Sequence, residues 1–172
     1  MTKDGRRFLI RPTSTGDADA LVAMRNEVAA EGDFIAAAPG DRSSLEEHLT
    51  LSSLLTEGGL SLTLELDDRV AGHLTARRLG DTPGVSPASV AEIAIAVHKS
   101  ARGMGLGRAL METAIDWARA VRLSKLALGV FPSNQRAISL YRSLGFVDEG
   151  MLPRRIVMPD GERDLMVMGL PL

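Results

Sequence analysis

Three glycines on alternate positions, Gly103, Gly105 and Gly107, stand directly before a segment with helical spacing of its apolar residues. A strand that passes through such a turn into a helix presents unpaired backbone N–H groups in one direction, and the helix dipole adds partial positive charge. Glycine also lets the backbone approach phosphate oxygens without interference from a Cβ atom. The spacing therefore predicts a phosphate-binding turn. The alternative is a tight strand-to-helix connection without a ligand.

The glycines fit neither of two common nucleotide-binding patterns. A P-loop requires Lys and then Ser or Thr after its last glycine, whereas Arg108 and Ala109 follow Gly107. The dinucleotide fingerprint G-x-G-x-x-G requires a glycine at position 108 or 110, which Arg108 and Leu110 occupy. The pattern that is present is Arg/Gln-x-x-Gly-x-Gly/Ala, over residues 102–107.

This motif resembles the pyrophosphate-binding motif of the GNAT superfamily, the acetyl-CoA-dependent N-acetyltransferases. Downstream, residues 134–146 read NQRAISLYRSLGF and resemble that family's Asn-x-x-Ala-x-x-Leu-Tyr-x-x-x-Gly-Phe segment. The resemblance is strong over residues 89–147 and extends to the order of elements along the whole chain. It implies an enzyme that transfers the acetyl group of acetyl-CoA to a primary amine by direct attack of that amine on the thioester. The amine would belong to a small molecule, an amino acid or a peptide N-terminus. The alternative is a non-catalytic CoA-binding sensor or regulatory module.

The resemblance also implies which residues meet the cofactor. Backbone amides of residues 102–107 are expected to hold the CoA pyrophosphate. Where the fourth strand splays from the fifth, N–H groups near Ala96 and Val97 are expected to polarise the thioester carbonyl. Asn134 is expected both to cap a helix and to face the pantetheine arm. The expected cofactor-binding residues are Ile95, Ala96, Val97, Arg102, Gly103, Met104, Gly105, Leu106, Gly107, Arg108, Asn134, Ala137 and Tyr141.

Two residues are expected to move protons. Tyr141, the only tyrosine in the sequence, stands where the family places a phenol that can protonate the departing CoA thiolate as a general acid. A packed core aromatic is the alternative. Glu92 lies among apolar residues of an expected strand, where a carboxylate is costly unless it is paired or hydrated. It is a candidate base for the acceptor ammonium, directly or through a water, and alternatively an outward-facing charge or an ion-pair partner.

The rest of the chain predicts a regular order of elements. Two capping boxes, Ser14 with Asp17 and Ser43 with Glu46, mark the starts of the first two helices. The order is β-α-α-β-β-β-α-β-α-β-β, an α/β or α+β fold with a mixed, mostly antiparallel sheet of six to seven strands and about four flanking helices. A βαβ connection makes the fourth and fifth strands parallel. Strands are expected at residues 6–12, 60–66, 69–79, 89–97, 124–130, 146–150 and 163–170, with a loop at 80–88.

Two stretches, residues 25–45 and 148–163, are expected to shape the acceptor site, and neither carries a motif that identifies the acceptor. The second stretch is expected to be largely a loop through Pro153, Pro159 and Gly161. It contains the pair Arg154–Arg155, which is either solvated surface or a contact for an acidic group of the substrate.

Composition narrows the possible functions. The 172 residues suit a single domain over 1–172, and a net charge of −2 with interspersed signs gives no case for nucleic-acid or membrane binding. The absence of cysteine excludes disulfides and a thiol nucleophile, and the N-terminus has no apolar signal core, so a cytoplasmic location is expected. The three histidines show no metal-ligand spacing, so no metal is expected. Association as a homodimer is left open.

Overall fold

A computed structural model describes residues 2, 5–79 and 89–172 of the chain, so the loop expected at 80–88 lies outside the described residues. The described part contains a seven-stranded sheet in the order β1-β2-β3-β4-β5-β7-β6. The strands are β1 (Phe8–Pro12), β2 (Leu60–Leu66), β3 (Arg69–Arg78), β4 (Val90–Val97), β5 (Lys125–Val130), β6 (Val147–Met158) and β7 (Gly161–Pro171). The α-helices are α1 (Ala18–Ala29), α2 (Ser44–Thr56), α3 (Leu106–Ala120) and α4 (Gln135–Ser143). The expected order of elements and the fold class are confirmed.

The helices begin where side-chain caps were expected. The Ser43 hydroxyl accepts the Glu46 backbone N–H at 3.3 Å, and the Glu46 carboxylate accepts the Ser43 N–H at 2.7 Å. Ser14 and Asp17 form the same reciprocal pair at the 3₁₀ turn that leads into α1. Asn134 caps α4, because its side-chain oxygen accepts a backbone N–H of the first turn at 3.2 Å. Such caps satisfy donors that a helix start would otherwise leave free.

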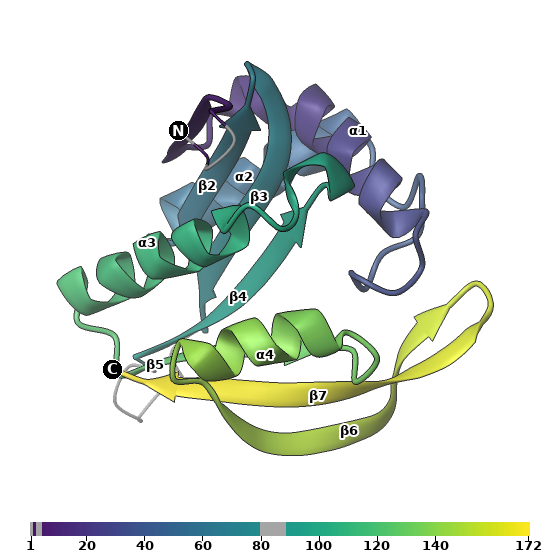
Figure 1. Cartoon of the computed structure of the whole chain (residues 1–172), viewed down its shortest axis with the longest axis vertical. Helices are drawn as coiled ribbons and strands as arrows, with labels where there is room; N and C mark the ends of the chain where they lie inside the picture. Colours follow the sequence, from purple (N-terminus) through teal and green to yellow (C-terminus); the bar gives the residue numbers. More distant parts are fainter. Residues whose placement is uncertain (1, 3–4, 80–88) are drawn as a thin grey trace.

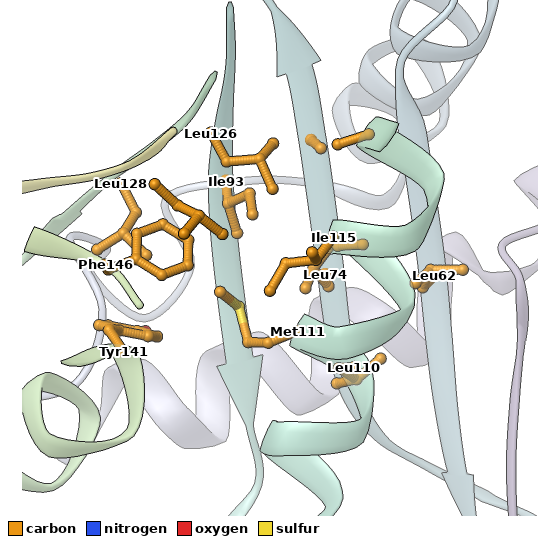
Figure 2. Packing of buried hydrophobic residues seen from close by; sticks show 14 of the residues in the cluster. Leu62, Leu74, Ile93, Leu110, Met111, Ile115, Leu126, Leu128, Tyr141 and Phe146 are labelled. Atoms are coloured by element: carbon orange, nitrogen blue, oxygen red, sulfur yellow. The ribbon is translucent and has the colours of Figure 1, made fainter. Parts of the chain in front are cut away.

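The helices cover both faces of the sheet. In Figure 1, α3 and α4 lie on one face, and α1 and α2 lie on the other. Figure 2 shows how the first face forms the main core, with side chains of α3 packed against side chains of β2, β3 and β4. Strand residues alternate between the faces. The alternation therefore decides which β3 and β4 side chains enter the core and which face α1 and α2. The labelled core residues of these elements are Leu62, Leu74, Ile93, Leu110, Met111 and Ile115.

The sheet opens between β4 and β5. These two strands are parallel, as the βαβ connection predicts, and their pairing runs from Val90↔Lys125 to Ile93↔Leu128. Beyond that point β4 continues to Val97 paired with β3 alone, and Figure 1 shows it diverging from β5 and β7. Backbone groups on one edge of β4 are thus left without a strand partner, and this opening positions the site.

The C-terminal part differs from the expectation. The loop expected through Pro153, Pro159 and Gly161 is instead mostly a long hairpin of β6 and β7, with register irregularities at Asp148/Gly150 and Leu152/Ile156. Strand β6 is an edge strand. Proline is tolerated on an edge because a missing N–H there breaks no ladder between two neighbours. Pro153 thus lies within a strand and not in a loop, although it falls in the stretch between Leu152 and Ile156 where the pairing with β7 is interrupted.

Candidate active site

The three alternate glycines of the sequence motif have different roles at the start of α3. Gly103 and Gly105 have φ of +85° and +80°, in the left-handed region that glycine adopts most easily. Gly107 has no positive φ, and a Cβ there would lie 3.8 Å from side-chain atoms of both Leu140 and Val97. Two glycines thus shape the turn, whereas the third keeps a space open beside it.

That space belongs to a cavity of about 280 Å³, here named the CoA cavity after the cofactor that the sequence resemblance implies. The Arg102 N–H, expected to belong to the free run over residues 102–107, donates instead to the Lys99 carbonyl at 3.3 Å. No described group accepts a hydrogen bond from the backbone N–H groups of residues 103–108, at the N-terminus of the 15-residue helix α3. Arg108 and Arg136 add positive charge to its lining. Free amides, a helix dipole and two guanidinium groups make this end of the cavity an anion site. The expected cofactor-binding residues all line it except Met104, which packs against the core.

Arg102 lines the cavity, but its side chain is committed elsewhere. Its guanidinium donates to both carboxylate oxygens of Glu31 at 2.7 Å each and, through Nε, to the Val97 carbonyl at 2.8 Å. It also stacks 4.1 Å from the centre of the Phe34 ring. These hydrogen bonds lower the pKa of the Glu31 carboxyl below its ordinary value. The arginine therefore fastens the segment after α1 to the end of β4.

The free edge of β4 offers two backbone donors. The Val90 carbonyl accepts from β3, and the His98 N–H donates to β3. In an antiparallel ladder this assignment alternates, so the Ala96 N–H also points to β3. The N–H groups of Ile95 and Val97 point the other way, past the end of the pairing with β5. The expected donor pair near Ala96 and Val97 is therefore replaced by Ile95 and Val97.

A second cavity of about 470 Å³, here named the acceptor cavity, lies on the α1 and α2 face of β3 and β4. Its floor follows the register of the two strands: His73 is opposite Ala96, and Arg77 is opposite Glu92. The two cavities share part of their lining, so they meet at the free edge of β4. The shared residues are Phe34, Ile35, Ile95, Ala96, Asn134 and Tyr141.

Tyr141 stands where the cavities meet and is also a core residue. It is 6% exposed, and its ring lies 5.9 Å from that of Phe146, so the packed-aromatic alternative holds for the ring. Its hydroxyl has no hydrogen-bond partner among the described residues. Burial raises the pKa of this phenol to about 12, which keeps it protonated at neutral pH.

Glu92 lies in the acceptor cavity, but it is exposed rather than partly buried as expected. Its carboxylate has no ion-pair or hydrogen-bond partner among the described residues. Strand geometry separates its Cα from that of Ala96 by roughly 13 Å, because each residue advances about 3.3 Å. A glutamate side chain cannot span this distance, so any proton path from the free edge of β4 to Glu92 needs intervening water.

His73 is a site residue that the sequence reasoning missed. Its Nε2 lies 2.9 Å from the Ser61 hydroxyl, and the ring lines the acceptor cavity level with Ala96. Burial lowers the pKa of the imidazole to about 4, so it is neutral at pH 7. The available signal was its place in the alternation of β3, which puts His73 on the face opposite Leu74.

The two stretches expected to shape the acceptor site can be compared with the lining of the two cavities. Arg154 and Arg155 line neither cavity, whereas Ile156 of the same strand lines the acceptor cavity. The segment around Phe34 and Ile35, part of residues 25–45, lines both cavities.

Over residues 2, 5–79 and 89–172, no group of His, Cys, Asp or Glu is arranged to hold a metal ion. Over the same ranges, no helix has the length and apolar character needed to cross a bilayer.

The architecture and the chain's relatives together define its family. A sheet that opens between two parallel strands, beside a helix start with free amides, is the arrangement implied by the sequence resemblance. Residues 26–146 match the model of the acetyltransferase (GNAT) family. This match covers well over half of the chain, and the protein belongs to that family.

Three relatives illustrate the similarity. The ribosomal protein bS18-alanine N-acetyltransferase of Escherichia coli K12 is 40% identical over 78 residues, 45% of this chain and 53% of that protein. The chain thus spans about half the length of the first curated relatives it matches. The L-amino acid N-acyltransferase MnaT of the same strain is 36% identical over 63 residues, 37% of each chain. A solved acetyltransferase of the GNAT family from Streptococcus pneumoniae has a TM-score of 0.84 and 30% identity, covering 96% of this chain and 100% of that one.

Proposed function

We propose that the protein is an acetyl-CoA-dependent N-acetyltransferase acting on a primary amine of a small molecule, an amino acid or a peptide N-terminus. The observation that carries this proposal is the meeting of two cavities at the free edge of β4. One cavity has a run of free amides at its end, and the other has charged and polar side chains on its floor. Two substrates can therefore be held separately and brought together at one edge.

The residues of the CoA cavity suit the cofactor. Amides of residues 103–108 would bind the pyrophosphate, with Arg108 and Arg136 adding positive charge. Asn134 keeps its capping role while its side chain faces the cavity toward the pantetheine arm. Acetyl-CoA, when bound, supplies a thioester carbonyl and a thiolate that can leave. The N–H groups of Ile95 and Val97 would then donate to the carbonyl oxygen, where negative charge develops during attack.

Tyr141 would act on the leaving sulfur. Its phenol pKa is about 12, whereas an ordinary thiol has a pKa of about 8.5, so full proton transfer is uphill by about 5 kcal/mol. A hydrogen bond from the phenol still lowers the energy of the developing thiolate, and the hydroxyl has no competing partner among the described residues. Tyr141 would therefore assist the departure of the thiolate by donating a hydrogen bond to it, without transferring its proton completely.

The acceptor amine must lose a proton before or during its attack. Glu92 would receive that proton through water in the acceptor cavity, because roughly 13 Å separates its Cα from that of Ala96. His73 lies level with Ala96, and its neutral imidazole can accept a hydrogen bond from the amine or from the first water of the path. No thiol nucleophile is present in the sequence. Direct attack therefore remains the proposed route.

The test is release of free thiol from acetyl-CoA in the presence of a panel of amines. We expect thiol release that depends on the amine, together with CoA binding in calorimetry. A non-catalytic CoA sensor would bind CoA and release no thiol with any amine. Absence of CoA binding at millimolar concentration would overturn both versions of the proposal.

A further inference from the structure

The acceptor cavity contains an arginine to which the proposed mechanism gives no role. Its lining includes three arginines from different parts of the chain: Arg25 of α1, Arg42 between α1 and α2, and Arg77 of β3. Two carboxylates, Glu47 and Glu92, line the described part of the same cavity. Each arginine is ion-paired, and the partners of Arg25 and Arg77, Asp41 and Glu57, lie outside the cavity lining.

Two of the three arginines, Arg42 and Arg77, form the shorter ion pairs. Arg42 donates to Glu47 at 2.9 Å, and the Glu47 side chain is only 5% exposed. Arg77 donates to Glu57 at 2.9 Å. Burial of Glu47 makes the first pair part of the protein's own structure, because a buried carboxylate without its partner is strongly destabilising. Arg42 is therefore a poor candidate for holding a ligand, whereas the Arg77–Glu57 pair, with side chains 43% and 52% exposed, lies toward solvent.

Arg25 is different because one of its donors is buried and lacks an acceptor. One terminal nitrogen donates to Asp41 at 3.1 Å, and Asp41 does not line the cavity. The Nε–H is buried and has no acceptor among the described residues. A buried donor without a partner is unfavourable by about 1–3 kcal/mol. An oxygen supplied from the cavity would satisfy it.

The position of Arg25 relates it to the reaction centre. Its neighbour Met24 belongs to the cluster against which Ala96 packs, on the face of the sheet where Figure 1 shows α1. Arg25 lines the acceptor cavity and not the CoA cavity. Its positive charge acts on the imidazole of His73, which lies opposite Ala96. The guanidinium is therefore on the acceptor side, close to where the amine must approach.

We propose that Arg25 binds the carboxylate of a small amino acid whose amine is the acetyl acceptor, an inference that rests on the proposed function. The Arg25 guanidinium lines the acceptor cavity and keeps donors that Asp41 does not use. A carboxylate on the carbon that bears the amine would accept from them, and its two oxygens match the fork of an arginine. A polyamine adds positive charge instead. A peptide N-terminus has a neutral amide at the same place.

The proposal is tested by binding, which does not require turnover. Common L-amino acids are titrated in calorimetry into the protein saturated with CoA, and each binder is compared with its own α-carboxamide. We expect the amino acid to bind at least about 10-fold more tightly than its amide, the loss of one charge-assisted contact. Equal binding of acid and amide, no binding of any amino acid at millimolar concentration, or tighter binding of a peptide with N-terminal alanine would each overturn it.

Two variants assign the effect to Arg25. Arg25→Gln should weaken amino-acid binding by about 10- to 100-fold and leave the CoA dissociation constant unchanged. Arg25→Lys keeps the charge without the fork and should restore part of the affinity. Arg119→Gln, an arginine of α3 that is 62% exposed, is the matched control and should change neither constant. Wild-type amino-acid affinity in Arg25→Gln would contradict the proposal.

Thiol release separates this inference from the proposed function. Amino-acid binding that depends on Arg25, combined with no thiol release from acetyl-CoA, would overturn the proposed transferase activity and support the carboxylate site. Thiol release that is as efficient with amino-acid amides as with amino acids would overturn the carboxylate site and support the transferase activity. The two proposals can thus fail independently.

Discussion

At the scale of single residues, Tyr141 combines two properties that its sequence pattern presents as alternatives. Its ring is packed against Phe146, and its hydroxyl is free of protein partners within the described residues. Tyr141→Phe removes only the hydroxyl. Hydrogen-bond donation to the leaving sulfur predicts that kcat falls by about 10²-fold while the CoA dissociation constant stays near wild type. Steady-state kinetics and calorimetry check the two parts.

The packing role of the same residue needs its own control. Phe146→Leu disturbs the ring contact without touching the hydroxyl, so it should lower the free energy of unfolding and leave kcat within a few-fold of wild type. Unchanged kcat in folded Tyr141→Phe would remove the phenol from the mechanism and leave only its packing role.

His73 makes a prediction about stability and pH. Its pKa is about 4 in the folded protein and about 6.5 when unfolded. Between these values the unfolded chain binds the extra proton, so stability falls as pH drops through this window. We expect a loss of about 2 kcal/mol from pH 7 to pH 5 that His73→Gln abolishes. Urea unfolding of both proteins at the two pH values measures it. An equal slope in the variant would contradict the assignment.

At the scale of elements, the β4–α3 turn shows what the sequence could and could not predict. The glycine spacing excludes the P-loop and dinucleotide motifs and predicts a phosphate site, and the phosphate site stays a prediction. Their separate roles could not, since φ distinguishes Gly103 and Gly105 from Gly107 only in the folded chain. The same holds for the thioester donors. Sheet register, not sequence, assigns Ala96 to β3 and leaves Ile95 free.

The distinction among the glycines gives a cleaner test than replacing any of them. Gly107→Val should fold, because the helical backbone tolerates a side chain and the nearest atoms lie 3.8 Å from a new Cβ. It should nevertheless fill the CoA cavity and weaken CoA binding by about 100-fold. Gly107→Ala is the matched control, since the motif admits alanine there, and it should bind nearly as wild type. Calorimetry on folded variants decides. Wild-type affinity in Gly107→Val would remove this position from the site.

The β6–β7 hairpin marks the other limit of sequence reasoning. Local signals at Pro153 and Gly161 indicate loops, whereas β6 continues through Pro153 as an edge strand whose pairing with β7 is interrupted between Leu152 and Ile156. Helix starts were predictable because Ser43, Glu46 and Asn134 act within one turn. Contacts between distant segments, such as Arg102 with Glu31, leave no periodic trace in a single sequence.

At the scale of the whole molecule, the Arg102–Glu31 pair connects the segment after α1 to the end of β4, where the two cavities meet. Arg102 begins the cofactor motif and holds the Val97 carbonyl at the free edge of β4. Glu31 and Phe34 belong to the segment after α1, and Phe34 lines both cavities. The Arg102 guanidinium contacts the Val97 carbonyl, the Glu31 carboxylate and the Phe34 ring. The wall shared by the two cavities therefore depends on an ion pair that contacts neither substrate in the proposed mechanism.

This arrangement predicts energetic coupling between the two partners. The side chains are 17% and 27% exposed, so their charge-assisted hydrogen bonds are only partly screened by solvent. In a double-mutant cycle of Glu31→Gln and Arg102→Gln, urea unfolding should give a coupling of about 1–2 kcal/mol. Each single variant should also raise the KM for the amine about 5- to 10-fold, because release of the segment carrying Phe34 loosens the wall of the acceptor cavity. The exposed pair of Arg119→Gln and Asp116→Asn serves as the control cycle and should show almost no coupling. Strictly additive losses at residues 31 and 102, with an unchanged KM, would mean that the segment after α1 is held by its apolar contacts and not by Arg102.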